Sequence, residues 1–383
     1  MDSQTQPRRP LADVVLVGGL SALLIGLPWH EYVVMAGPYL SAWKELVLAA
    51  ILVAVVARRW ERVEECPWLF WVVTFGGVCI CSALANDQSL LPARPLVFPM
   101  LAGLAAFTLR SEERDRILRG FLLSALVVVG YALVAHVAFR WCGGAPHYRP
   151  AIANPLLRAL AFPYYTPNYS RGDRLIGPFL NDDYFGIWCV AVLALLLAES
   201  RWRIPAVLAV LTAAVWTYSR SALCAFGAAG AVLAWRRDRR VLWLIPIGLG
   251  LAVIFWTSQQ GERFQHPIDT GIGRVVAVQQ AGRTLASGSL LGEGPAANQV
   301  YDMQYARLVY QLGWAGLAML GWLGFILYQR VAHAGLPVHV GLAAACLALL
   351  VGGVGCEVLE VPQTSWTWWI LLGLLGCDED PDP

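Results

Sequence analysis

Charged residues are scarce in this chain: they make up 14% of its 383 residues, whereas 58% of the residues are hydrophobic. Soluble domains carry about a quarter charged residues, so the composition excludes a soluble enzyme and predicts an integral membrane protein. The net charge is only +2. Nucleic-acid binding requires a clustered basic face, which this sequence lacks, so no nucleic acid is expected as a partner.

Other absences narrow the choice further. The nine cysteines form no CxxC pair and no cluster with histidine, which argues against a zinc-type metal site. The N-terminal stretch lacks a small-residue cleavage site, so it predicts a retained first helix rather than a signal peptide. We find no internal repeat of the kind that transporters often contain.

Apolar runs recur from one end of the chain to the other, and each is near the ~20 residues that a helix needs to cross about 30 Å of hydrocarbon. They predict an all-α integral membrane protein, a polytopic bundle of about 10–12 transmembrane helices. The predicted spans are 11–28, 40–57, 67–85, 94–109, 120–139, 184–199, 204–218, 220–235, 241–258, 302–328, 338–355 and 365–377.

Arginine is concentrated in every second connecting segment. By the positive-inside rule, these segments and both termini lie on the cytoplasmic side. The orientation depends on Arg8, Arg9, Arg58, Arg59, Arg62, Arg110, Arg114, Arg116, Arg119, Arg201, Arg203, Arg236, Arg237, Arg239, Arg240 and Arg330. The predicted order is N-terminal transmembrane helices, a first outer loop, central transmembrane helices, a second outer loop, and C-terminal transmembrane helices with a short acidic cytoplasmic tail, over residues 1–139, 140–183, 184–258, 259–301 and 302–383.

The two outer loops are long, and loops of this length are uncommon unless they are functional or disordered. Their apolar and aromatic content argues for order. In the second loop, an apolar-periodic piece from Arg274 to Leu285 predicts an amphipathic helix that lies on the membrane.

Several arginines do not follow the charge bias, because they fall in the outer loops or near outer helix ends. Arg220 stands between two apolar segments with only Ser219 and Ser221 beside it. A charge there costs several kcal/mol unless it faces a water-filled cavity or a partner. Either this arginine extends to lipid phosphates from a hairpin turn, or it forms an anion site. The full set is Arg140, Arg149, Arg158, Arg171, Arg174, Arg220, Arg263, Arg274, Arg283 and Arg307.

The first outer loop ends in "RGDRLIGPFLNDD", which begins at Arg171. Arg171 and Arg174 flank Asp173, which allows a salt bridge inside the loop as well as contact with a substrate. Asn181 and the two aspartates after it suit the start of a helix, since side-chain oxygens there accept hydrogen bonds from unpaired N–H groups. Paired aspartates can also bind Mg²⁺, but only Asp173 is near as a third acid, so no metal is expected.

The second outer loop runs into the next predicted helix as "GEGPAANQVYDMQYARLVYQLGW". Asp302 and Tyr305 are three residues apart and therefore share one helical face, with Arg307 just beyond. Asp302 can cap this helix while Tyr305 joins an interfacial aromatic belt. A carboxylate near a desolvated interface can instead act as a general base, and Glu293 is the second candidate for that role.

Five segments occur in a recognisable order: "RLIGPFLNDDYFG", "TYSRSALCAFGAAGAVLAW", "GIGR" with "LLGEG", "YDMQYARLVYQLGWAGLAMLGWLGF" and "EVLEVPQTSWTWWILLGLLG". In this order they resemble the O-antigen ligase and polysaccharide polymerase family of bacterial inner membranes, which makes O-antigen and exopolysaccharide. The resemblance covers about residues 170–377. The earlier helices are similar only in spacing.

The resemblance implies a polytopic glycosyltransferase that moves an oligosaccharide from a polyprenyl diphosphate to an acceptor on the periplasmic side. It implies inversion at the transferred sugar and no metal, nucleotide sugar or other cofactor. Arg174 and Arg220 would neutralise the leaving diphosphate, and Asp302 would take the acceptor proton. The residues expected to contact the diphosphate or the sugars are Arg171, Asn181, Asp183, Arg274, Glu293 and Tyr305.

The residue at position 302 bears on the type of transfer. Ligases of this family carry a histidine there, whereas polymerases carry an Asp-Asn-x-Tyr pattern that Asp302 to Tyr305 resembles, with Met303 in place of the asparagine. This favours a polymerase, with a polyprenyl-linked oligosaccharide and membrane lipid as partners and a chain-length regulator as a further candidate. A ligase with another acceptor and a multi-helix transporter stay open as alternatives.

Overall fold

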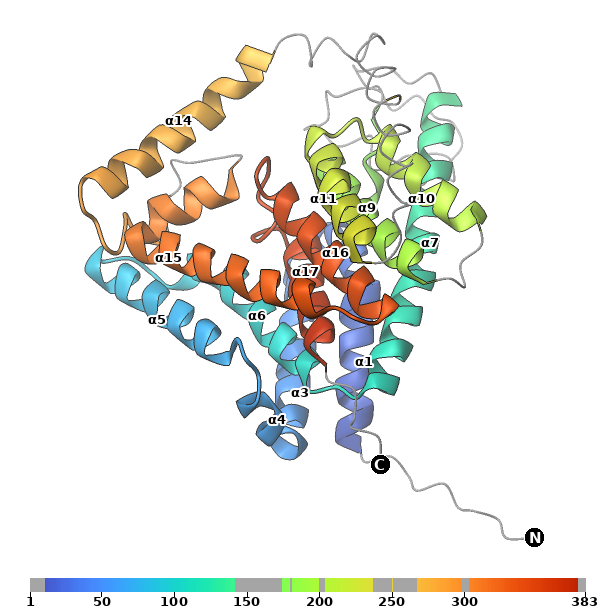
Figure 1. Cartoon of the computed structure of the whole chain (residues 1–383), viewed down its shortest axis with the longest axis horizontal. Coiled ribbons are helices and arrows are strands. Elements are labelled where there is room, and N and C mark those ends of the chain that lie inside the picture. The colour runs from blue at the N-terminus through green and yellow to red at the C-terminus, as the bar shows by residue number, and fades with distance from the viewer. Residues whose placement is uncertain are drawn as a thin grey trace.

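The computed structural model describes residues 11–141, 174–179, 181–199, 204–236, 250, 267–297 and 303–377. Every regular element in these ranges is a helix (Figure 1), so the predicted all-α class is confirmed for the described part of the chain.

The N-terminal half consists of helices that follow one another with short connections. Pro28, Pro38 and Pro92 each stand in a 3-10 turn that leads into the next helix, where a fixed φ and a missing N–H are tolerated. The helices are α1 (Leu11–Gly26), α2 (His30–Ala36), α3 (Trp43–Arg58), α4 (Trp60–Glu64), α5 (Leu69–Ala85), α6 (Arg94–Phe107) and α7 (Ser111–Trp141).

The C-terminal half contains the helices that later form the site. They are α9 (Asp182–Ala198), α10 (Ile204–Trp216), α11 (Arg220–Arg236), α14 (Pro267–Ala286), α15 (Gln304–His333), α16 (Pro337–Gly352) and α17 (Pro362–Gly376), with a 3-10 turn, η5 (Gly177–Phe179), before α9. Figure 1 shows α16 and α17 in the centre of the molecule, with α14 at one edge beside α15.

The helices lie where the apolar runs predict them, with corrections at their ends. Apart from residue 250, the predicted span 241–258 falls outside the described residues, and the helix predicted over 120–139 begins earlier, at Ser111. Among the described residues, four helical stretches are long and apolar enough to cross a membrane: Leu11–Val34, Tyr39–Arg58, Ser111–Ala138 and Gln304–His333. Shorter apolar helices cover Leu69–Ala85, Leu91–Phe107, Ile204–Trp216 and Pro337–Gly352. The amphipathic helix predicted in the second outer loop is present as the longer α14.

The core is built where α9, α16 and α17 pack together and against α6 and α11. Almost every residue of α9 and α17 is buried. Glycine permits a close helix contact: a Cβ on Gly103 of α6 would lie 2.7 Å from the Trp369 carbonyl oxygen of α17. Small residues at such crossings let two backbones approach each other inside a membrane.

The N-terminal helices are joined at one end by a buried arginine. Arg59 donates to the Asp13 carboxylate at 2.7 Å, to the Glu113 carboxylate at 2.8 Å and to the Thr108 carbonyl at 2.9 Å. These partners belong to α1, to α7 and to the turn between α6 and α7, so one side chain fixes several helices relative to each other.

Helix α15 is broken near its middle. Gly313 has φ +61° and ψ −144°, outside the helical range, and such a break leaves backbone groups without their helical partners. The segment after α14 supplies partners. The Glu293 N–H donates to the Tyr310 carbonyl and the Gly294 N–H to the Gln311 carbonyl, each at 3.0 Å.

The same segment also accepts hydrogen bonds from the helix beyond the break. The Trp314 N–H donates to the Ser289 carbonyl at 3.2 Å, and the Ala315 N–H donates to the Leu290 carbonyl at 3.0 Å. Irregular backbone at membrane depth is tolerated where protein surrounds it and its polar groups are paired. The segment 287–297 is predicted as part of an outer loop. In the structure, its backbone forms the hydrogen bonds that α15 lacks at the break.

Candidate functional site

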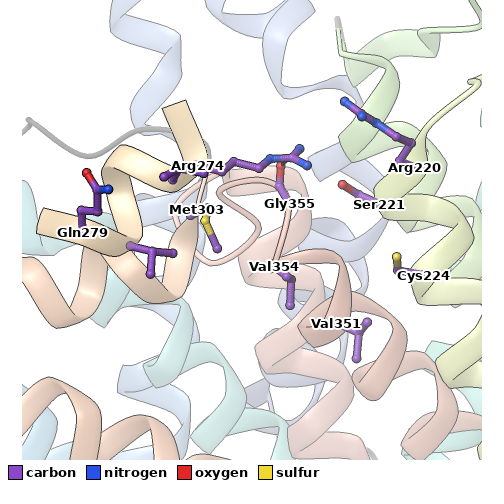
Figure 2. A pocket seen from close by; sticks show the side chains of 11 residues that line it. Arg220, Ser221, Cys224, Arg274, Gln279, Met303, Val351, Val354 and Gly355 are labelled. Carbon is purple, nitrogen blue, oxygen red and sulfur yellow. Dashed lines mark hydrogen bonds between the residues drawn. The ribbon is translucent and has the colours of Figure 1, made fainter. Parts of the chain in front are cut away.

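A cavity of about 410 Å³ lies between α11, α14 and the C-terminal end of α16. Two arginines belong to its lining, and most of the remaining wall is apolar. Figure 2 shows the side chains of Arg220 and Arg274 on the same side of the cavity, with Val351 and Val354 beneath them in this view. The lining residues are Arg220, Ser221, Cys224, Arg274, Val275, Val278, Gln279, Met303, Val351, Val354 and Gly355.

Arg220 stands at the first position of α11. Ser219 begins that helix: its hydroxyl accepts a hydrogen bond from the Ala222 N–H at 3.1 Å and donates to an Asp183 carboxylate oxygen at 2.6 Å. Among charged groups, Arg274 acts on Arg220 most strongly, followed by Asp183 and then by Arg174. A cation at the positive end of a helix, beside a second cation, is electrostatically unfavourable. An anion between the two arginines would relieve both repulsions.

Arg274 extends from α14 into the cavity, and a backbone carbonyl group fixes its side chain. Its guanidinium donates to the Gly355 carbonyl at 3.1 Å. A Cβ at Gly355 would collide with the Ser221 hydroxyl and would lie 3.3 Å from the Arg274 guanidinium. The absence of a side chain at Gly355 therefore lets the turn after α16 fit between α11 and α14.

Arg174 and Asp182 form a buried ion pair at the start of α9. The loop that contains Arg174 is also tied to α10, because the Leu175 N–H donates to the Trp216 carbonyl at 2.9 Å. Asp173 and Arg171 lie outside the described residues, and so does the salt bridge considered within the loop. Because its partner is a buried carboxylate, Arg174 is suited to fixing the start of α9.

Asn181 caps α9 as its sequence predicts. Its side-chain oxygen accepts hydrogen bonds from the Asp183 N–H at 2.8 Å and from the Tyr184 N–H at 3.4 Å. The two aspartates after it turn to different partners, since Asp182 pairs with Arg174 and Asp183 accepts from Ser219. A Mg²⁺ ion bound by both aspartates would need their carboxylates to point to the same side. Because the two carboxylates have different partners, this arrangement does not favour a metal ion there.

The remaining predicted site residues that the structure describes are not gathered at the cavity. The Tyr305 hydroxyl donates to the Leu350 carbonyl, which ties α15 to α16. Glu293 is exposed beside Tyr310 and does not line the cavity. Asp302 lies outside the described residues, and the residue after it, Met303, is part of the cavity lining.

Sequence reasoning missed two contributors to the site. Ser219 was seen only as a neighbour of Arg220, although its hydroxyl connects α11 to Asp183. Arg307 was noted for its position, but its partners Glu357 and Glu360 belong to the segment between α16 and α17. Such contacts join distant parts of the chain, and no local pattern identifies them.

The arrangement offers two guanidinium groups, from α11 and α14, beside an apolar wall. Guanidinium groups bind phosphate through paired hydrogen bonds, and the wall suits a hydrocarbon chain. An amphipathic anion fits both features. In comparisons with known proteins, no family model matches the chain, and no curated protein matches its sequence.

Proposed function

We propose that the protein is a membrane glycosyltransferase that polymerises polyprenyl-diphosphate-linked oligosaccharide units into surface polysaccharide, O-antigen or exopolysaccharide. The transfer occurs on the periplasmic side of the bacterial inner membrane. In this proposal the chain crosses the membrane with about twelve helices, and both termini are cytoplasmic. The ordered motifs of residues 170–377 support the proposal from the sequence.

One observation carries the proposal furthest: Arg220 and Arg274, from separate helices, line one cavity whose other walls are largely apolar. A diphosphate presents charged oxygens to both guanidinium groups, and its polyprenyl chain suits Val351, Val354 and the outer leaflet beyond them. Donors that face the leaving diphosphate stabilise the charge that develops on it during transfer.

The proposed reaction is an inverting displacement at the anomeric carbon of the donor sugar. The acceptor hydroxyl forms the new C–O bond while its proton passes to a carboxylate, and the bond to the diphosphate breaks with the electron pair leaving on the phosphate oxygen. Asp302 is the preferred base, because its sequence neighbour Met303 lines the cavity whereas Glu293 does not. Arg174, Asn181 and Asp183 hold the helix ends on which the site is built.

The experiment is complementation of a strain that lacks its own polymerase, with surface polysaccharide resolved on a gel. We expect Arg220→Ala and Arg274→Ala to lose the long-chain ladder while single repeat units accumulate on the lipid. Arg283→Ala is the matched control, since Arg283 is an exposed arginine in the last turn of the same helix as Arg274. An intact ladder from both cavity variants would refute the proposal and favour the transporter alternative.

A binding measurement tests the site without turnover. Cys224 lines the cavity one helical turn beyond Arg220 and is exposed, as Cys81 on α5 is. Farnesyl diphosphate should slow maleimide labelling of Cys224 but not of Cys81, and this protection should disappear in Arg274→Ala and persist in Arg283→Ala. Absence of protection in the unmodified protein would contradict a diphosphate site.

A further inference from the structure

Arg307, in the second turn of α15, contacts two carboxylates of the segment that joins α16 to α17. Its guanidinium donates to Glu357 at 2.6 Å and lies 3.1 Å from Glu360. The side chain of Arg307 is 13% exposed, and those of Glu357 and Glu360 are 23% and 17% exposed. The three charges therefore form a largely buried cluster beside the cavity.

Gln304 adds a second connection to the same segment. Its side-chain nitrogen donates to Glu360 at 3.1 Å, and its side-chain oxygen accepts from the Leu359 N–H at 3.1 Å. Gln304 and Arg307 are three residues apart and so share one face of α15. We call Gln304, Arg307, Glu357 and Glu360 the Arg307 clamp.

The clamped segment forms part of the cavity wall. Val354 and Gly355 line the cavity, and Gly355 comes two residues before Glu357. The Gly355 carbonyl accepts the hydrogen bond of Arg274, and there is no room for a Cβ between Gly355 and Ser221. A small shift of this turn would remove the acceptor that orients Arg274.

Stability alone does not require charges in the clamp. Replacing a buried ion pair by apolar side chains of similar size is often neutral or stabilising, and here two carboxylates share one guanidinium. Ionic contacts of this kind fix the position of the joined segments relative to each other, because charged hydrogen bonds are short and directional.

We infer that Arg307 is a positioning residue: through Glu357 and Glu360 it holds the turn after α16 so that the Gly355 carbonyl directs Arg274 toward Arg220. The inference rests on the proposed function in taking the Arg220–Arg274 cavity as the diphosphate site. Its geometric part concerns only the placement of Arg274 and can be tested without substrate.

The test measures the electrostatic potential at Cys224 with two thiol reagents of opposite charge, the anionic sulfonatoethyl and the cationic trimethylammonioethyl methanethiosulfonate. The ratio of the anionic to the cationic reaction rate is taken at Cys224 and divided by the same ratio at Cys81. Arg274→Ala should lower this quotient about thirtyfold, because the loss of one charge roughly 8 Å away, at an effective dielectric constant of about 40, slows the anionic reagent and speeds the cationic one by about fivefold to sixfold each.

The decisive variant is the double substitution Arg307→Met with Glu357→Gln, which breaks the clamp without changing the net charge. We expect its quotient to fall toward that of Arg274→Ala, and deuterium uptake in residues 353–361 to rise while uptake in α16 stays unchanged. The swapped pair, Arg307→Glu with Glu357→Arg, should restore both readouts. Gln304→Ala, which removes no charge, should shift both readouts in the same direction by less.

Two results would overturn the inference. Unchanged deuterium uptake in the double variant would mean that the clamp does not hold the turn. Raised uptake with an unchanged quotient would mean that the turn does not place Arg274. If farnesyl diphosphate fails to protect Cys224 in the unmodified protein while the quotients behave as expected, the proposed function fails and the positioning role of Arg307 stands.

Discussion

The break in α15 gives the sharpest prediction about the fold, the substitution Gly313→Ala. The backbone of Gly313, with φ +61° and ψ −144°, lies near a region that only glycine occupies readily, and another residue there costs about 1–3 kcal/mol. A Cβ would also lie 2.6 Å from the Gly292 nitrogen and closer still to the Ser289 carbonyl oxygen. Both neighbours are backbone atoms, so relieving the overlap adds about 1–3 kcal/mol.

The expected loss of stability for Gly313→Ala is therefore about 2–6 kcal/mol. It can be measured as a lowered unfolding midpoint in detergent micelles, with faster amide exchange in residues 289–294. Gly321→Ala is the matched control on the same helix, because a Cβ there meets nothing within 4 Å. Alanine replaces glycine in a helix with a gain of about 0.5–1 kcal/mol. Equal midpoints for the two variants would refute the assignment of the break to Gly313.

Two further predictions concern charged side chains outside the cavity. Arg59→Met should lower the unfolding free energy by about 3–5 kcal/mol, because it removes the partner of two carboxylates. Arg58→Met, at the exposed neighbouring position, should have little effect. Similar losses of stability in both variants would mean that the buried cluster around Arg59 is not the cause. Burial, reinforced by Glu357, raises the pKa of Glu360 above its usual 4.5. The folded chain then binds that proton more tightly than the unfolded chain, so stability should fall as the pH rises from about 4.5 through the raised pKa. Glu360→Gln should abolish this fall, and parallel pH profiles of the two proteins would contradict it.

The helices could be predicted because their signals are local. Apolar runs locate α1, α3 and α5 to within a few residues of their observed ends. The sequence Asn181-Asp-Asp predicts the capped start of α9, since the capping oxygen and the N–H groups it binds are neighbours in the chain. In these cases the residues that determine an element are part of that element.

The break at Gly313 could not be predicted in this way. The local sequence "YQLGWAG" contains no proline, and glycine is common in transmembrane helices. The break depends on partners from the segment after α14, which bonds to the backbone on both sides of Gly313. A pattern confined to α15 holds no information about those partners, so a continuous helix was the expected result.

Contacts with carboxylates explain the positions of two of the arginines that depart from the charge bias. Arg174 and Arg307 both end in contacts with carboxylates, Asp182 for the first and Glu357 with Glu360 for the second. Their positions follow from the architecture alone, and the sequence could not distinguish them from arginines that bind a substrate.

Arg220 and Arg274 differ in their surroundings. Repulsion from Arg274 acts on Arg220 more strongly than the attraction of Asp183, and Arg220 also opposes the dipole of its own helix. The mutual repulsion of these two cations is a cost to folding. A function that supplies an anion there explains the cost, and the apolar wall beneath the arginines narrows the anion to one attached to a hydrocarbon chain. The two mutually repelling arginines are therefore the strongest reason to look for a bound diphosphate at this cavity.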